Sequence, residues 1–469
     1  MARYICQVCE YIYDEDKEVV KLEDLSDDWD CPVCRSNKKL FNIIEEIAKE
    51  PTSDIETATA ENDELIDLSK TSDDLEIYLS DIHQIAETGQ SISEPMRTAK
   101  PIISWDDVLI KGAQLAKMPL NQDVAVNSQT IIGLDAKQPM IIETPIYITH
   151  MSFGALSKEA KISLAKGSAA IKTAICSGEG GVLPESRQNA YKYIFEFVPN
   201  QYSATEEIIK SVDAIEIKIG QSAKPGMGGH LPGNKVTKEI ADIRGFKEGE
   251  DIISPARFED ITNKEELKQK VDWLREISNG RPVGIKFAAG NIEADLGVAL
   301  FANPDFITID GRAGATGSAP KVVKESTSVP TLFALYRARK FLDQNDAPNI
   351  SLVITGGLRM SSDFAKALAL GADAVAIGTS ALIAIGCQQY RVCNTGRCPI
   401  GIATQDPVLR KRLDIEKASK TLKNYLNVST EELKNFARLT GNNDVHHLSV
   451  SDLCTTNTEI SNHTSIEHV

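Results

Sequence analysis

The sequence predicts an α/β protein in which a large barrel of parallel strands follows a small unit that carries cysteines. Three observations on the chain of 469 residues support this prediction. Its length favours two or three units. Seven of its nine cysteines fall into two clusters, one near each end. From about residue 140, short apolar runs alternate with longer stretches of helical spacing, which indicates a parallel sheet.

The first forty residues contain two Cys-x-x-Cys pairs, Cys6 with Cys9 and Cys31 with Cys34. Each pair forms a tight turn, and four thiolates complete a tetrahedral metal site. The spacing suits a structural zinc as well as a single iron. The residue types therefore predict a metal site without choosing the metal.

Residues 3–40 also resemble rubredoxin. The resemblance rests on the Cys-Pro-Val-Cys turn and on aromatic residues that match the rubredoxin core, namely Tyr4, Tyr11, Tyr13 and Trp29. The loop between the two pairs is shorter than in free rubredoxins, and Glu10 stands where glycine is usual. The resemblance implies a rubredoxin-like domain over residues 1–40 that holds one redox-active iron, with zinc as the alternative.

Residues 41–95 have a strongly acidic composition, with fifteen Asp and Glu against two Lys and Arg. Such a segment buries little apolar surface, so we expect an acidic, partly helical linker. A docking surface for a basic electron carrier is the alternative.

The charge and hydropathy of the chain exclude several classes of partner. The net charge of −16 argues against nucleic acid and anionic membranes, because both select basic surfaces. No apolar run reaches the length of a membrane span, and the N-terminal residues lack the layout of a secretion signal. We therefore expect a cytoplasmic protein.

Seven apolar strands can be read directly between residues 140 and 385, and polar or glycine-rich residues follow almost every one. A TIM (β/α)8 barrel has eight such strands and carries its active site at their carboxyl ends. An open doubly wound sheet is the alternative. It is disfavoured because no G-x-G-x-x-G opens a helix after a first strand. Helices that pack back on the barrel are expected after residue 405.

Two consecutive predicted strands end in residues that suit a phosphate. Gly356 and Gly357 follow one strand, and Gly378 and Thr379 follow the next. Bare backbone N–H groups at this corner of a barrel bind phosphate in many enzymes, although glycines here can also be simple packing turns.

Lys286 lies inside an apolar strand, in VGIKFAAG. A lysine that points into a barrel needs an anionic partner. The N1–C2=O edge of a flavin would supply one on reduction. The alternative partner is a buried carboxylate such as Asp310.

Three cysteines follow the last predicted strand, Cys387, Cys393 and Cys398, with Pro399 after the third. Three thiolates suit an iron–sulfur cluster that lacks one iron of a cubane. A zinc with water as its fourth ligand fits the count equally well. The neighbouring phosphate corner favours a redox cluster, because a cluster there lies beside a flavin.

From about residue 96 to the end, the chain resembles the FMN-binding synthase domain of glutamate synthase, most of all the short archaeal-type members with a rubredoxin-like N-terminus. The matching stretches are THMSFGALS, SGEGG, IEIKIGQSAKPGMGGHLPGNKV, ISP, GRAGATGSAP, GTSALIAIGC and CNTGRCPIGIATQDP. The resemblance implies a barrel over residues 96–469 that holds FMN with a 3Fe-4S cluster on Cys387, Cys393 and Cys398.

The same resemblance assigns the remaining site residues. The positions implied to contact the flavin are Met151, Ser152, Phe153, Gly154, Glu179, Gln221 and Lys286, with Gly356, Gly357, Gly378 and Thr379 at its phosphate. Those implied at the substrate are Lys224, His230 and Arg244, and the implied catalytic residues are Glu179, Lys224 and Lys286. His230 replaces the usual glutamine and Met227 a glutamate, so His230 can equally be structural.

The implied reaction is reduction of 2-iminoglutarate, formed from 2-oxoglutarate and ammonia, to L-glutamate. We expect a separate glutaminase subunit and an electron-donating ferredoxin or reductase, because neither a glutaminase domain nor an NADPH-binding unit is recognised. A homo-oligomer is left open. Two other hypotheses are a related flavin reaction on an N-substituted glutamate or another amino acid, and an electron-transfer subunit of a larger complex.

Overall fold

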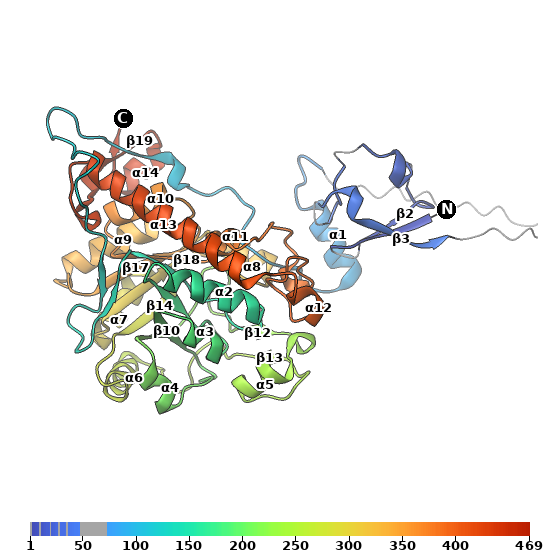
Figure 1. The fold of residues 1–469 in the computed structure, drawn as a ribbon, viewed down its shortest axis with the longest axis horizontal. Helices are drawn as coiled ribbons and strands as arrows, with labels where there is room; N and C mark the ends of the chain where they lie inside the picture. Colours follow the sequence, from blue (N-terminus) through green and yellow to red (C-terminus); the bar gives the residue numbers. More distant parts are fainter. Residues whose placement is uncertain (1, 9–10, 19, 27–28, 34–35, 47–72) are drawn as a thin grey trace, which may run out of the picture. The chain divides into compact units, whose positions relative to one another are not determined.

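A computed structural model describes residues 2–8, 11–18, 20–26, 29–33, 36–46 and 73–469. The chain divides into two units, Met1–Ser93 and Glu94–Val469 (Figure 1). Each unit is described by itself.

The N-terminal unit contains a three-stranded antiparallel sheet in the order β2 (Ile12–Asp14), β1 (Ala2–Cys6), β3 (Phe41–Glu46). The ring of Trp29 packs edge-on against Tyr13 and Phe41, with centroids 5.5 and 5.6 Å away. β3 thus continues the sheet past residue 40, and α1 (Leu79–Thr88) lies within the acidic segment. The division into residues 1–40, 41–95 and 96–469 stays a prediction.

The second unit is a closed barrel of eight parallel strands, which confirms the barrel and rules out the open sheet. Parallel pairing of Val375 with Ile146 joins the last strand to the first and closes the barrel. The strands in chain order are β8 (Ile146–Ile148), β9 (Ala174–Cys176), β10 (Lys192–Phe197), β11 (Ala214–Lys218), β14 (Val283–Ala288), β15 (Phe306–Asp310), β17 (Ser351–Thr355) and β18 (Ala374–Ile377).

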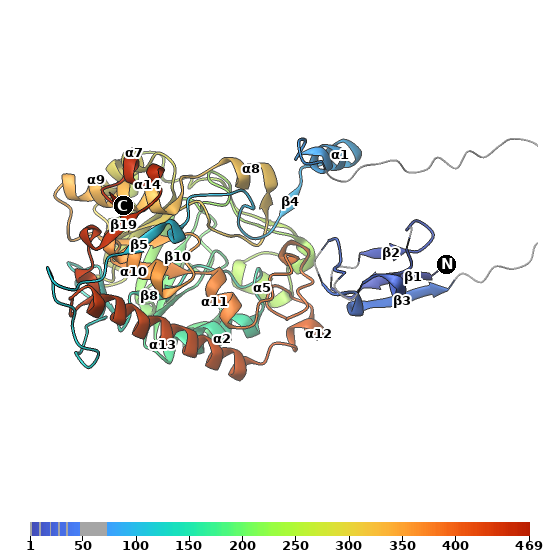
Figure 2. The same ribbon diagram turned by 90° about the horizontal axis from the view of Figure 1, so that it is seen from above.

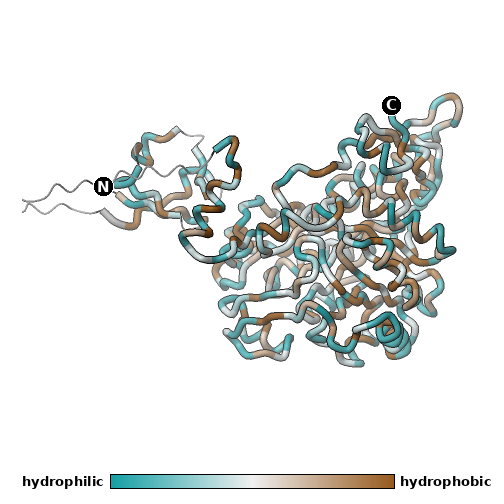
Figure 3. Tube along the Cα trace, turned by 180° about the vertical axis from the view of Figure 1, so that it is seen from behind, coloured by the Kyte–Doolittle hydropathy of each residue, from teal (hydrophilic) through white to brown (hydrophobic). Residues whose placement is uncertain are grey.

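Helices surround the barrel (Figures 1 and 2). They are α2 (Lys158–Ala169), α3 (Pro184–Gln188), α4 (Glu206–Ser211), α5 (Lys238–Arg244), α6 (Lys264–Ile277), α7 (Ile292–Ala302), α8 (Lys321–Ser326), α9 (Thr331–Gln344), α10 (Ser361–Ala369), α11 (Thr379–Ala384), α12 (Pro407–Arg410), α13 (Ile415–Leu439) and α14 (Thr458–His463). The outer helix α6 is largely hydrophilic along its trace (Figure 3), because it buries only one stripe against the barrel.

The long helix α13 packs directly on α2. The two approach closely at Gly167, where a Cβ atom would lie 2.8 Å from Leu422 Cδ2. The side chain of Ser157 caps α2 by accepting a hydrogen bond from Ala160 N, and its hydroxyl donates to Gly401 O at 2.7 Å. The position and the orientation of α2 are therefore fixed by hydrogen bonds at its N-terminus and by packing against α13 on its outer face.

Short strands complete the unit. A hairpin of β6 (Thr130–Ile132) and β7 (Met140–Ile142) places Ile132, Met140 and Ile142 in one apolar cluster with the barrel interior. The others are β4 (Ser93–Glu94), β5 (Val108–Ile110), β12 (His230–Leu231), β13 (Ile252–Ile253), β16 (Ala319–Pro320), β19 (Leu453–Thr455) and β20 (Glu467–His468). None of the described helices is both long and apolar enough to cross a membrane.

Candidate active site

A cavity of about 440 Å³ opens at the carboxyl ends of the barrel strands. All eight strands contribute a residue to its lining. Six of these residues lie at or just beyond the strand ends, namely His150, Glu179, Lys218, Asp310, Gly356 and Gly378, while Glu196 and Lys286 lie within the last three residues of β10 and β14. This is the end at which barrels of this kind carry their active sites.

One side of the cavity, the glycine corner, consists of Gly356, Gly357, Gly378 and Thr379. Gly356 has a φ of +118°, and a Cβ atom there would lie 2.4 Å from Gly311 O. Gly357 has a φ of +84°, and a Cβ would meet Ala313 Cβ at 2.4 Å. Only glycine fits either position, so this wall is bare backbone.

Three arginines line the same cavity, Arg97, Arg359 and Arg391. The pKa of Arg97 is lowered by partial removal from water and by the charges of the other two guanidinium groups. Sequence reasoning missed these residues, because they lie on loops that share no motif. Together they form a positively charged group that favours an anionic ligand.

Elsewhere in the cavity, Lys286 Nζ lies 3.4 Å from Glu196 Oε1, and both side chains are buried. Burial would lower the pKa of Lys286, but the carboxylates of Glu196, Glu216 and Asp310 outweigh burial and raise it. Asp310 instead accepts hydrogen bonds from Ser222 N and Oγ, at 3.1 and 2.8 Å. The carboxylate in contact with Lys286 is thus Glu196 rather than Asp310.

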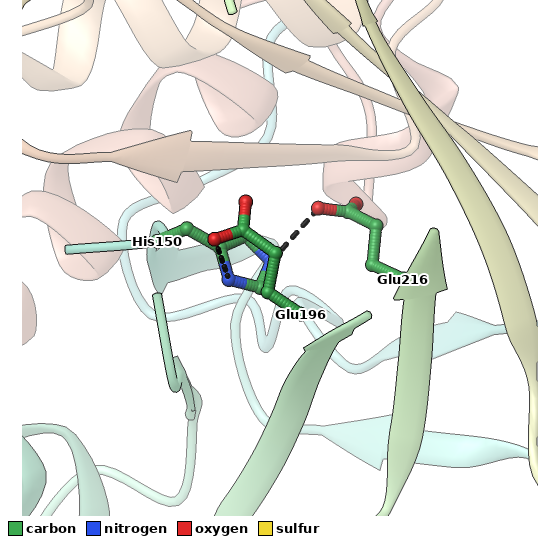
Figure 4. A group of neighbouring side chains, drawn as sticks. All are labelled: His150, Glu196 and Glu216. Atoms are coloured by element: carbon green, nitrogen blue, oxygen red, sulfur yellow. Dashed lines mark ion pairs between the residues drawn. The ribbon is translucent and has the colours of Figure 1, made fainter. Parts of the chain in front are cut away.

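His150 lies between Glu196 and Glu216, as Figure 4 shows. Gly178 N donates to His150 Nδ1 at 3.2 Å, which places the proton of a neutral ring on Nε2. Nε2 lies 2.8 Å from Glu216 Oε2, although not in line with it. These three residues are close enough to hold a metal ion. The neutral His150 ring is poorly suited to this use. Its Nδ1 lone pair already accepts from Gly178 N, and its Nε2 carries the proton where a metal would need a lone pair.

Glu216 also accepts a hydrogen bond from the Thr308 hydroxyl. Burial alone would raise the pKa of Glu216, but His150, Lys286 and Thr308 lower it. The cluster of His150, Glu196, Glu216 and Lys286 is therefore a network of buried polar groups, in which the contacts with His150, Lys286 and Thr308 offset the burial of the two carboxylates. Glu196 and Glu216 were not predicted, although an acidic residue inside an apolar strand was a visible signal.

Glu179 forms an ion pair with Lys218 and accepts a hydrogen bond from Gly229 N at 3.2 Å. Burial opposes ionisation, but Lys218, Ser254 and Lys224 lower the pKa of Glu179 to about 2. Glu179 is thus a fixed carboxylate at neutral pH and not a proton donor. Lys218, another residue that sequence reasoning missed, has a raised pKa because Glu179 outweighs its burial.

Lys224 and Arg244 are both buried and both line the cavity. Their direct partners are neutral carbonyls: Lys224 Nζ donates to Gly228 O at 3.0 Å, and Arg244 Nη2 donates to Phe153 O at 2.7 Å. Burial lowers the pKa of each, and the charge of Lys218 lowers that of Lys224 further. The charge of Glu179 raises the pKa of both and partly offsets their burial, but its carboxylate is already paired with Lys218. Among the described residues, neither cation has an ion pair of its own, so the two favour an anionic ligand in this cavity.

Of the predicted flavin residues in the loop after β8, Met151 and Ser152 line the cavity. Phe153 packs into a separate apolar cluster and offers only its carbonyl to Arg244. Gly154 lies behind Arg244, where a Cβ atom would approach Nη2 to 2.9 Å. Gln221 lines the cavity and donates to Thr316 Oγ1 at 3.4 Å.

His230 reaches the cavity edge, but its ring is half exposed. Nε2 lies 3.0 Å from Asp251 Oδ2, so the ring already has a carboxylate partner. Met227 is 42% exposed. The structure therefore gives His230 a structural contact, and its role at a substrate stays a prediction.

The cysteine loop, residues 387–398, brings Cys387, Cys393 and Cys398 to the same cavity. Burial and the neighbouring thiols raise the pKa of Cys393 to about 12, and burial raises that of Cys387. Lys235 Nζ anchors the loop by donating to Cys393 O and Asn394 O, at 2.9 and 3.0 Å.

The N-terminal cysteines can be followed only in part. Cys6 and Cys31 are fully buried, and Cys6 Sγ lies 3.2 Å from Ser36 Oγ. Cys9 and Cys34 lie outside the described residues. The four-thiolate site stays a prediction.

Comparison with known proteins gives matches over most of the chain. The family model described as "Conserved region in glutamate synthase" matches residues 80–443. The "Glutamate synthase large subunit-like protein" of Rhizobium meliloti is 37% identical over 406 residues, which cover 82% of this chain and 91% of the relative. The "Archaeal glutamate synthase [NADPH]" of Archaeoglobus fulgidus is 37% identical over 397 residues, which cover 79% of this chain and 77% of the relative.

Among solved structures, a lactate oxidase of Pediococcus acidilactici aligns with a TM-score of 0.47 at 14% identity, over 73% of this chain and 82% of that one. A flavocytochrome b2 variant aligns with a TM-score of 0.45 at 16% identity, over 74% of this chain and 76% of that one.

Proposed function

The chain belongs to the glutamate synthase family, and from that premise we propose that it is an FMN-dependent oxidoreductase that forms L-glutamate from 2-oxoglutarate and ammonia. One observation carries the proposal. A single cavity joins a bare glycine corner, two buried cations with neutral partners and three cysteine thiols. The glycine corner suits the phosphate of a flavin, the two cations suit a dicarboxylate, and the three thiols suit a redox cluster.

The glycine corner fits the phosphate of FMN. Its glycines exclude side chains, so backbone N–H groups can approach the phosphate oxygens. Arg97, Arg359 and Arg391 supply positive charge to the same cavity. Lys286, held cationic by Glu196 and Glu216, would stabilise the negative charge of a reduced flavin ring. FMN bound here would supply the hydride for the reduction.

Lys224 and Arg244 fit the two carboxylates of 2-oxoglutarate. A planar guanidinium binds a carboxylate through paired hydrogen bonds, and an ammonium adds a second point charge. Both groups are buried, so ion pairing in the cavity is stronger than in water. The ionised Glu179 fixes Lys218 and the Gly229 backbone, and can accept a hydrogen bond from the cationic nitrogen of 2-iminoglutarate.

The cysteine loop fits a 3Fe-4S cluster better than one zinc ion. Zn–S bonds of about 2.3 Å would draw three sulfurs to within about 4 Å of one another. Among the described residues, Cys387, Cys393 and Cys398 do not form a group whose ligand atoms all lie within 4.8 Å of one another. A larger cluster can bridge more widely spaced thiols. It would relay electrons to the flavin from a rubredoxin-type iron, and ultimately from a ferredoxin or reductase.

The nitrogen would arrive as free ammonia or from a separate glutaminase subunit. A second candidate function is the same flavin chemistry on an N-substituted glutamate. His230 favours this candidate, because it stands where the family resemblance expects a glutamine and its ring contacts Asp251 instead of offering a neutral amide to the substrate.

The test is anaerobic purification with flavin, iron and sulfide analysis, followed by an assay with 2-oxoglutarate, ammonia and a reduced one-electron carrier. We expect bound FMN, iron with inorganic sulfide, and glutamate as product. Bound flavin whose spectrum is unchanged by 2-oxoglutarate but changed by an N-substituted glutamate would favour the second candidate. Purification without flavin would refute both.

A further inference from the structure

Lys161 lies on α2 and is 1% exposed, yet it has no carboxylate in direct contact among the described residues. Its Nζ donates instead to three backbone carbonyls, those of Met151, Cys176 and Ser177, each at 2.9 Å. A buried ammonium with only neutral partners is costly, so its presence needs a reason.

The three carbonyls belong to two different loops of the cavity wall. Met151 is the third residue after β8 and lies in the same loop as Ser152. Cys176 ends β9, and Ser177 leads into the loop that carries Glu179. A single Lys161 side chain therefore joins the two loops at the point where each leaves its strand. Sequence reasoning singled out residues in both loops, but nothing that joins them.

We propose that Lys161 is a positioning residue that fixes the β8 and β9 loops relative to each other and so shapes the wall of the cavity formed by Met151, Ser152 and Glu179. This inference rests on the proposed function, because it assigns those loops to flavin and substrate. The ammonium suits the task, since its three N–H groups can satisfy three carbonyls at once. The close packing of α2 against α13 at Gly167 holds the lysine from outside.

The position of the ammonium also makes it sensitive to pH. Burial lowers the pKa of Lys161 to about 8, and the nearby carboxylate of Glu196 only partly opposes this. The Cys176 thiol is itself held neutral, because burial raises its pKa. Above pH 8, a neutral amine would present a lone pair to one of the three carbonyl oxygens, and one of the three hydrogen bonds would be lost.

The other charged groups around α2 are already paired. His150 on the β8 side contacts Glu196 and Glu216. From α3, Glu185 pairs with Lys158, and from α13, Glu416 pairs with Lys166. None of these pairs supplies a partner to the Lys161 ammonium, so the loss of its proton is not compensated by a neighbour.

The experiment compares amide hydrogen exchange in the full chain for the wild type, K161M and K166M. Methionine keeps the unbranched stem but removes the three donors. Lys166 is on the same helix and pairs with Glu416 at the surface, so K166M is the matched control. We expect K161M to lose about tenfold in protection at residues 150–154 and 176–181, with no loss in K166M. Equal protection in all three proteins would overturn the proposal.

If K161M does not fold, the pH dependence of amide exchange in the wild type tests the proposal instead. Protection factors of the same two segments should fall between pH 7 and pH 9.5 relative to the rest of the barrel, and no relative fall would refute the proposal. The exchange measurement does not need flavin. Absence of flavin from the purified protein would therefore count against the proposed function, while the exchange result would still decide the role of Lys161.

Discussion

The two sides of the cavity are built in opposite ways. At the glycine corner, side chains are excluded, and backbone of positive φ forms the wall. At the charged side, made by Glu179, Glu196, Lys218, Lys224 and Lys286, buried ionised groups form it and hold one another in place. The glycine corner can be damaged only by adding atoms, whereas the charged side is damaged by removing one charge and leaving its partner buried.

The largest effect should come from K286M. It leaves Glu196 buried without its cation, and breaking a buried pair in this way costs about 3–5 kcal/mol. Urea unfolding should show this loss of stability, and flavin binding should weaken with it. The double variant K286M/E196Q removes both charges and should recover most of the stability but not the activity. A double variant as unstable as K286M would show that the pair is not what holds this side together.

The next effect concerns Glu179. Its pKa is lowered to about 2, from about 4.5 in an unfolded chain, so ionisation of this carboxyl, favoured by Lys218, Ser254 and Lys224, stabilises the fold by about 3 kcal/mol at neutral pH relative to its protonated form. The contribution is fully present above about pH 5 and is lost as the pH falls through 2. E179Q should therefore be less stable than the wild type at pH 7, and the difference should shrink at pH 3. A stability difference that does not change with pH would contradict the assignment of an ionised carboxylate.

At the glycine corner, G356A should destabilise by about 2 kcal/mol and weaken flavin binding, because φ is +118° and the new Cβ meets Gly311 O. Gly249 is the matched control. It also has a positive φ, +78°, but a Cβ there meets nothing within 4 Å. G249A therefore measures backbone strain alone and should leave the flavin dissociation constant unchanged. Equal loss of flavin binding in both variants would show that strain, and not the closed space, explains the effect.

The comparison also explains how much the sequence could predict. Gly356, Gly357 and Gly378 were recognisable because they follow two consecutive apolar strands, the corner at which barrels commonly bind phosphate. β10 was missed because Val198 and Pro199 follow it instead. Glu196 was missed as well, because it lies in β10.

The charged side was predicted only in part, because ion pairing depends on which strand residues face one another across the barrel. Glu216 and Lys218 lie in a stretch quoted for its strand and family pattern, but nothing local says that they face inward. Lys286 was expected to meet a flavin edge, with Asp310 as the alternative partner, and only the closed barrel brings Glu196 within 3.4 Å of it. Sequence periodicity gives the face of a strand, whereas partners across a barrel depend on register and closure.

The smallest effect should come from His230, at the edge of the charged side. Its contact with Asp251 is exposed on both partners, and exposed ion pairs contribute about 0–1 kcal/mol. H230A should therefore leave stability nearly unchanged, and D251N is the matched control because it removes the charge of the same contact without touching the ring. If His230 only braces Asp251, the two variants should alter the KM for 2-oxoglutarate equally and slightly. A rise in KM of tenfold or more in H230A alone would mean that the ring binds the substrate directly, and the charged side would then extend to His230.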